Sequence, residues 1–259
     1  MDVKMNKTAQ VAVWIILAVV LLASVILFFT LTSKEDVEII ESGQVDFVNA
    51  PSFMQRCTRE YVLDAVDIML PQGGFVSPKN SIWFNNTNIE YLCENTGFYE
   101  PCVNQHPLIV KEIEEEIRNY IYPRVEECFG ELGEEIRKRN GEFVFGDLDI
   151  EISLGEDRIF LTLNRDVKIE KNGAEKNYKK FEIVVPSPVY NLAVIAVEIA
   201  SEEAQFCYFE QAGYSVYYPR YKIERYVMSA PTKIYVIRDK DTGKEMNIAI
   251  RSCAMPAGI

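Results

Sequence analysis

The segment that most constrains this chain is residues 11–32, VAVWIILAVVLLASVILFFTLT, which holds no charged residue, proline or glycine. These residues, at about 1.5 Å each in a helix, span about 33 Å, enough to cross the hydrocarbon core of a bilayer. A helix of a soluble protein rarely stays apolar on every face for that length, because one face normally meets water. The sequence therefore predicts a single membrane anchor over residues 10–33, in contact with the lipid bilayer through residues 11–32.

Charges on either side of this segment predict its orientation. Lys4 and Lys7 precede it, whereas Lys34 is followed by several acidic residues in the stretch 35–41. The positive-inside rule places residues 1–9 in the cytoplasm and the rest of the chain outside the cell. The apolar stretch is longer than that of a cleaved secretory signal, and no A-x-A site follows it, so we expect an uncleaved, single-pass anchor in the cell membrane.

The start of the chain also resembles archaeal type IV pilin precursors, in which a basic residue and a small residue precede a long apolar helix. The similarity lies in KTAQVAVWIILAVVLLASVILFF, which begins at Lys7. It implies cleavage between Ala9 and Gln10 and packing of the helix in a filament core. A permanent anchor and a processed filament subunit are thus both open from these residues.

All six cysteines follow the apolar segment. An even number on the predicted outer side favours a disulfide framework, although the sequence alone does not choose among the pairings. Local positions favour one set, which closes a turn-rich loop, joins two predicted helices, and joins the end of a helix to a late strand. In that order the pairs are Cys93 with Cys102, Cys57 with Cys128, and Cys207 with Cys253.

The remainder of the chain reads as an acidic spacer over residues 34–50 and a domain over residues 51–259. Apolar residues at helical spacing predict a first helix after the N-cap candidate Ser52, and a second over residues 108–129 that Pro123 kinks or splits. Between them, a long loop stapled by cysteines contains an N-glycosylation sequon at Asn85.

From Glu142 the apolar period changes to two, which predicts an antiparallel meander. A third helix over residues 189–209 and a strand hairpin around KDTGKE follow. The expected fold class is therefore α+β, with a single N-terminal transmembrane helix and an extracytoplasmic domain of helices packed on an antiparallel sheet, stapled by disulfides. A helical part over residues 51–140 and a sheet part over residues 141–259 are expected within it.

Charge and motifs argue against several functions. The 27 Lys and Arg against 39 Asp and Glu disfavour nucleic-acid binding, which needs a basic surface. The lone His106 makes a nucleophile–histidine site and a zinc site improbable, and Gly73-Gly74 lacks the residues of a phosphate loop. The stretch DKDTG (239–243) lacks the later ligands of a calcium loop and reads as a hairpin turn. We expect no catalytic, cofactor-binding or metal-binding residues.

One carboxylate pattern and one tyrosine cluster remain. Acidic residues at alternating strand or turn positions are expected to face water rather than to form a catalytic pair; they are Asp149, Glu151, Asp157 and Glu170. Tyrosines gather around Pro219 in GYSVYYPRYKIERY and form either a stacking surface for glycan or protein or the filling of a sheet face. The candidate surface residues are Tyr214, Tyr217, Tyr218 and Tyr221.

Several motifs resemble an uncharacterised archaeal family of membrane-anchored surface proteins. They are KTAQVAVWIIL, FMQRCTREYVLDAVDIMLPQGGF, IEEEIRNYIYPRVEEC and the hairpin KIYVIRDKDTGKEMNIAIR. The resemblance implies a location and an architecture, but no activity and no catalytic residues.

We therefore expect a non-enzymatic cell-surface protein that serves envelope structure, adhesion or the binding of a protein or glycan partner. The first alternative is the pilin-like subunit processed before Gln10. The second is an extracytoplasmic hydrolase or chaperone that uses the loop between Gly74 and His106.

Overall fold

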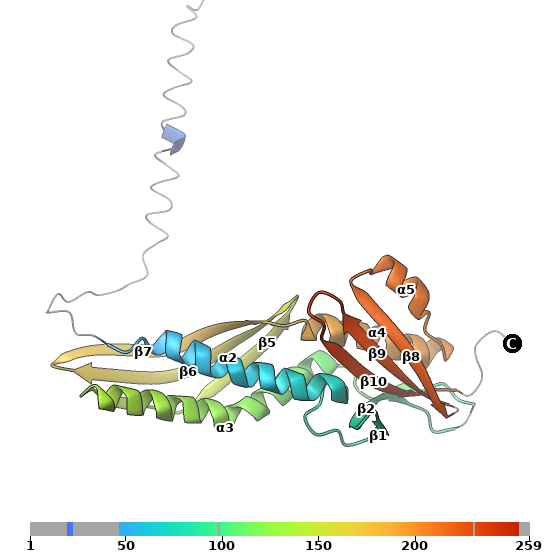
Figure 1. Ribbon diagram of the computed structural model, residues 1–259, viewed down its shortest axis with the longest axis horizontal. Coiled ribbons are helices and arrows are strands. Elements are labelled where there is room, and N and C mark those ends of the chain that lie inside the picture. Colours follow the sequence, from blue (N-terminus) through green and yellow to red (C-terminus); the bar gives the residue numbers. More distant parts are fainter. Residues whose placement is uncertain (1–19, 23–46, 98, 230, 254–259) are drawn as a thin grey trace, which may run out of the picture. The chain divides into compact units, whose positions relative to one another are not determined.

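The structure is a computed structural model that describes residues 20–22, 47–97, 99–229 and 231–253 (Figure 1). The chain divides into two units, Met1–Gln44 and Val45–Ile259, and the second unit holds all the described strands. The cleavage site expected between Ala9 and Gln10 lies outside the described residues, as does most of the predicted anchor. Among the residues that are described, no helix is both long enough and apolar enough to cross a membrane.

Two long helices, α2 (Ala50–Met69) and α3 (Ile109–Lys138), run side by side along one sheet (Figure 1). Each carries an apolar stripe at helical spacing, and the residues of both stripes are fully buried because they face the rest of the domain. Those residues include Met54, Val62 and Ala65 in α2, and Ile113, Ile117, Ile121 and Val125 in α3.

Two expectations for these helices are wrong. The N-cap of α2 is Asn49, whose Oδ1 accepts a hydrogen bond from Ser52 N at 3.1 Å, so Ser52 lies in the first turn. α3 is one helix of 30 residues that continues to Lys138, and Pro123 lies inside it without splitting it. Buried residues continue on both sides of Pro123, and this packing outweighs the one backbone hydrogen bond that proline cannot make.

Glycines shape the turn that follows α2. A short 3-10 helix, η1 (Leu70–Gln72), leads to Gly73 and Gly74, which adopt φ angles of 84° and 96°. Glycine adopts positive φ angles without steric cost, which explains the glycine pair at this turn. A Cβ atom at Gly73 would lie 3.2 Å from the Cβ of Glu90, so glycine also lets the turn approach the neighbouring strand closely.

The first sheet is antiparallel, and its strands are β4 (Glu142–Phe145), β5 (Asp149–Gly155), β6 (Arg158–Lys171) and β7 (Ala174–Pro186). β6 pairs with β7 along one edge, and with β4 and β5 along the other. The predicted meander is confirmed in this sheet. β6 is a single strand of 14 residues, and its register with β7 shifts between Asn164 and Val167.

The second sheet is mixed and has the strand order β1-β2-β10-β9-β8, with β3 also paired to β2. Its strands are β1 (Ser81–Phe84), β2 (Thr87–Glu94), β3 (Val103–Asn104), β8 (Tyr221–Ser229), β9 (Thr232–Asp239) and β10 (Glu245–Arg251). β2 runs parallel to β10, whereas β9 pairs antiparallel with both β10 and β8. The predicted hairpin of the last two strands is confirmed.

The second sheet corrects two predictions. The stretch expected as a long loop contributes β1, β2 and β3, so the residues before 140 are not a purely helical part. The sheet is also not wholly antiparallel, because of the β2–β10 pair. Five consecutive residues of β2, from Ile89 to Cys93, are buried. A strand that is buried on both faces does not alternate between apolar and polar residues, so the alternating pattern that predicts strands is missing here.

The helix α4 (Val189–Phe206) joins the two sheets, since it contacts strands of both. Its residues Leu192, Ile195 and Ile199 belong to one large core that also contains buried residues of each sheet. A second, smaller core lies among Ile89, Tyr91, Ile234, Val236 and Ala249, with Ile82 and Phe84 of β1 packed against it. Residues of β1 thus cover residues of β2, β9 and β10.

A partly buried ion-pair cluster also ties the sheets together. Arg220 pairs with Asp157, in the β5–β6 turn, and with Asp239, at the end of β9, at 2.6 Å. The hydrogen bond from Arg220 lowers the pKa of Asp157. Burial pushes the pKa of Asp239 upward, but hydrogen bonds from Arg220 and from nearby backbone amides outweigh it, so the net pKa is lowered. Both carboxylates are therefore held in the ionised form that Arg220 needs.

Candidate functional site

The tyrosine-rich segment divides between a short helix, α5 (Gln211–Tyr217), and the strand β8 that follows it. Glu210 caps α5, because its Oε1 accepts hydrogen bonds from Ala212 N at 3.2 Å and Gly213 N at 3.3 Å. Before it, α4 ends at Cys207 in the left-handed conformation. After it, Arg220 is held in the ion-pair cluster. The helix is therefore fixed at both ends.

Two of the four candidate tyrosines face inward. The ring of Tyr214 packs against Phe209, with centroids 5.5 Å apart, and against Tyr218 at 4.6 Å. Burial, followed by the charge of Glu198, raises the pKa of Tyr214, so its hydroxyl stays neutral. The hydroxyl of Tyr221 accepts a hydrogen bond from Asn191 Nδ2 at 3.0 Å. Tyr214 and Tyr221 therefore pack within the fold and do not form the candidate binding surface.

The other two tyrosines face solvent. Val216, Tyr217 and Tyr218 are 79%, 84% and 52% exposed. We call these three residues the α5 surface. Large side chains that are exposed on or next to a helix held at both ends lose little conformational freedom when a partner covers them. The α5 surface is therefore the candidate binding site.

The disulfide framework supports this site. Of the pairings open to the sequence, the structure contains the three that local positions favoured, and the described residues include no free cysteine. Cys57–Cys128 links α2 to α3, and Cys93–Cys102 closes the loop after β2. Cys207–Cys253 links the end of α4 to the end of β10, beside the start of α5.

A buried polar cluster lies next to that last disulfide. Glu203, at the end of α4, is fully buried and binds Lys233 Nζ at 2.6 Å and Ser252 Oγ at 2.7 Å. Its other carboxylate oxygen accepts the hydroxyl of Tyr235, whose pKa is raised by burial and by Glu203. Lys233 also donates to the carbonyl of Cys207 at 2.6 Å. Every charged group here has its partners, as in a structural network.

Glu203 and Lys233 are not among the residues that the sequence singled out. A signal was present, because Glu203 follows Ile195 and Ile199 at intervals of four on the apolar stripe of a predicted helix. An acid on such a stripe must be buried with a partner, although the sequence does not say which partner.

His106 lies in a second, partly buried cluster. Its Nδ1 is 2.5 Å from Glu112 Oε2, its Nε2 is 3.6 Å from Glu90 Oε1, and its ring contacts Phe75. Glu90 also accepts hydrogen bonds from the backbone amides of Lys79, at 2.6 Å, and Asn80. Among the described residues, the side-chain partners of His106 are carboxylates and an aromatic ring, not a serine or cysteine. The cluster holds the turn after Gly74 onto β2 rather than assembling a nucleophile.

The remaining candidate sites are the DKDTG stretch and the acidic residues of β5. The DKDTG stretch forms the β9–β10 turn, and its first carboxylate is occupied by Arg220. Asp149 and Glu151 are exposed side by side on β5, where Asn164 bonds to both. No group of three metal-ligating side chains that could hold an ion occurs within the described ranges.

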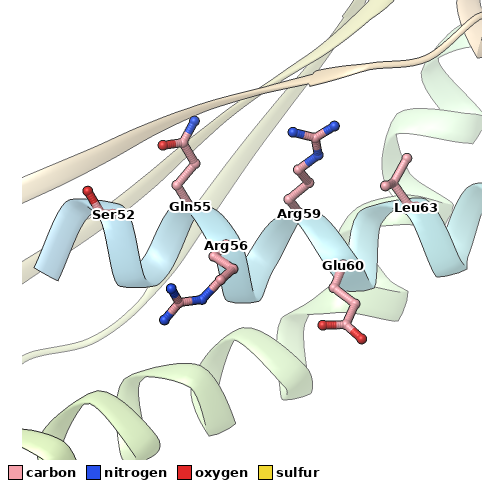
Figure 2. A pocket seen from close by; sticks show the side chains of 6 residues that line it. All are labelled: Ser52, Gln55, Arg56, Arg59, Glu60 and Leu63. Atoms are coloured by element: carbon pink, nitrogen blue, oxygen red, sulfur yellow. The ribbon is translucent and has the colours of Figure 1, made fainter.

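The outer face of α2 carries a hollow of about 490 Å³. Figure 2 shows its lining, with Gln55, Arg59 and Leu63 on one side of the helix and Arg56 and Glu60 on the other. All the lining side chains come from one helix, so the hollow is a surface groove. It assembles no residues from distant parts of the chain.

Asn85 lies at an exposed position between β1 and β2. The flanking aromatic Trp83 is exposed as well, whereas Phe84 is half-buried and its ring lies 5.4 Å from that of Tyr226 on β8. Through this contact the loop region after Gly74 meets the tyrosine-rich segment.

Comparison with protein-family profiles, with curated proteins and with solved structures found no match for this chain.

Proposed function

We propose that this chain is a membrane-anchored cell-surface protein whose disulfide-bonded domain binds a protein or glycan partner through the α5 surface. One observation carries the proposal: all six cysteines are paired, and all follow the apolar segment that precedes the domain. Disulfides persist in oxidising compartments. The charges on either side of residues 11–32 likewise predict that the domain lies outside the cell. The resemblance to archaeal membrane-anchored surface proteins agrees with this location.

The binding part of the proposal rests on the α5 surface. Tyrosine supplies a large, rigid contact area at low entropy cost and offers both an apolar ring and a hydroxyl. The polar clusters at Glu203 and His106 have their partners within the fold, so they leave the α5 surface as the strongest site for a partner.

Mass analysis of the protein extracted from its native membrane tests the location. We expect an intact N-terminus and a gain of six hydrogens on reduction, two for each of the three disulfides. No gain on reduction would contradict the proposed exterior location. A mature chain that begins at Gln10 would instead favour the pilin-like filament subunit, because only processing removes residues 1–9.

Site-specific photo-crosslinking in the native cell envelope tests the binding surface. A photoreactive phenylalanine analogue replaces Tyr217 in one variant and Phe160, an exposed aromatic on the open face of the first sheet, in a matched control. We expect a discrete adduct from position 217 and none from position 160, because the partner covers α5. Equal adducts from both positions, or none from position 217, would contradict the α5 assignment.

A further inference from the structure

The turn that joins β1 to β2 has an unusual backbone for two non-glycine residues. Asn85 and Asn86 both adopt positive φ angles, 47° and 66°. Phe84 and Thr87 pair across the turn, so it is a two-residue hairpin loop of the kind that needs positive φ at both positions. Asparagine is the residue besides glycine that enters this region most readily. The positive φ angles that this turn needs therefore account for the two consecutive asparagines.

Three of these residues also form a glycosylation sequon. Asn85, Asn86 and Thr87 match the acceptor pattern, which requires threonine or serine two residues after the asparagine. Asn85 is exposed, and its side chain makes no hydrogen bond with the described residues. The side-chain amide is therefore free at the tip of a rigid hairpin.

An aromatic ring pair includes the residue next to Asn85 in the chain. Phe84 directly precedes Asn85 and shares a face of the hairpin with Thr87, because the two are cross-strand partners. Its ring is only half-buried, and it meets the exposed ring of Tyr226 at a tilt of 47°. The two partly exposed rings offer an apolar surface one residue along the chain from the acceptor, and the apolar face of a sugar ring packs well on such a surface.

We infer that Asn85 carries an N-linked glycan whose first sugar packs on the Phe84–Tyr226 ring pair. The inference rests on the proposed outward location of the domain. The donor is a polyprenyl-linked glycosyl phosphate. In the transfer, a bond forms between Asn85 Nδ2 and the sugar's C1 atom, the bond from C1 to the phosphate oxygen breaks, and Nδ2 loses one proton as the lipid phosphate leaves.

Peptide mass analysis of the full chain from its native membrane tests the attachment. We expect a glycan mass on the peptide that contains Asn85, retained in Thr87→Ser and lost in Thr87→Val. Both substitutions leave the positive-φ asparagines in place, and valine keeps the β-branched shape. An unmodified Asn85 in a chain whose disulfides are intact overturns the glycan while leaving the surface location standing. Free cysteines together with an unmodified Asn85 would overturn both.

Thermal unfolding in lipid nanodiscs tests the packing of the sugar. We expect the enzymatically deglycosylated chain to melt about 2–4 °C below the glycosylated chain, the shift that one aromatic contact produces in a domain of this size. In Phe84→Leu the two forms should melt together, while Trp83→Leu keeps the difference. Should Phe84→Leu not fold, Tyr226→Leu serves in its place. An undiminished difference in the ring variant would overturn the packing.

Discussion

Replacement of both Cys57 and Cys128 by alanine is expected to lower the free energy of unfolding by about 4 kcal/mol. The bridge closes a loop over a sequence separation of 71 residues, and the loss of loop-closure entropy in the unfolded chain grows with that separation. It also ties together the two helices that cover the first sheet. Urea denaturation of the oxidised protein, followed by circular dichroism, measures the change.

The matched control is the pair Cys93→Ala and Cys102→Ala. Their bridge spans a separation of only 9 residues, so its removal should cost about 2–3 kcal/mol. Both sulfurs of this pair are buried, which makes the loss of packing comparable. A larger cost for the short loop than for the long one would show that strain or packing, not chain entropy, dominates these bridges.

Lys233→Met is expected to lower the free energy of unfolding by about 3–5 kcal/mol. The substitution leaves the carboxylate of Glu203 fully buried without its cation, and the cost of such an unpaired buried charge exceeds the value of the pair itself. The carbonyl of Cys207 also loses its donor. Chemical denaturation at neutral pH measures the effect.

Two variants separate this effect from the loss of a lysine as such. The double variant Lys233→Met with Glu203→Gln should recover much of the stability, because no buried charge remains. Lys244→Met removes the partner of Asp67 in a pair whose side chains are 38% and 54% exposed, and should cost under about 1 kcal/mol. If both lysine variants cost the same, the buried carboxylate is not the origin of the effect.

The helices show what local pattern determines. The apolar residues of α2 and α3 recur at helical spacing, and most of those in α3 are buried in the structure. In α2 the match is looser, because Phe53, Cys57 and Tyr61 are only partly buried. The boundaries were harder, since Pro123 is a strong helix-breaking signal in isolation. Its effect is overridden by contacts with residues far away in the chain, which a local reading does not contain.

The tyrosines of the candidate site show what residue spacing in the sequence does not predict. Spacing in the sequence places Tyr214, Tyr217, Tyr218 and Tyr221 together, but does not separate the inward pair from the outward pair. That separation depends on where Phe209 and Asn191 lie, and both are positioned by α4 and its neighbours. The exposed surface is therefore a property of the packed domain.

The sequence by itself determined the apolar segment, the helical faces, the alternating strands of the first sheet and the favoured cysteine pairs. Each depends on residues close together in the chain or on a simple periodicity. Only the tertiary structure decided that β2 lies parallel to β10, that Glu203 meets Lys233, and that the ring of Phe84 lies against that of Tyr226. Those contacts join residues distant in the chain, and their free energy exists only once the whole core has formed.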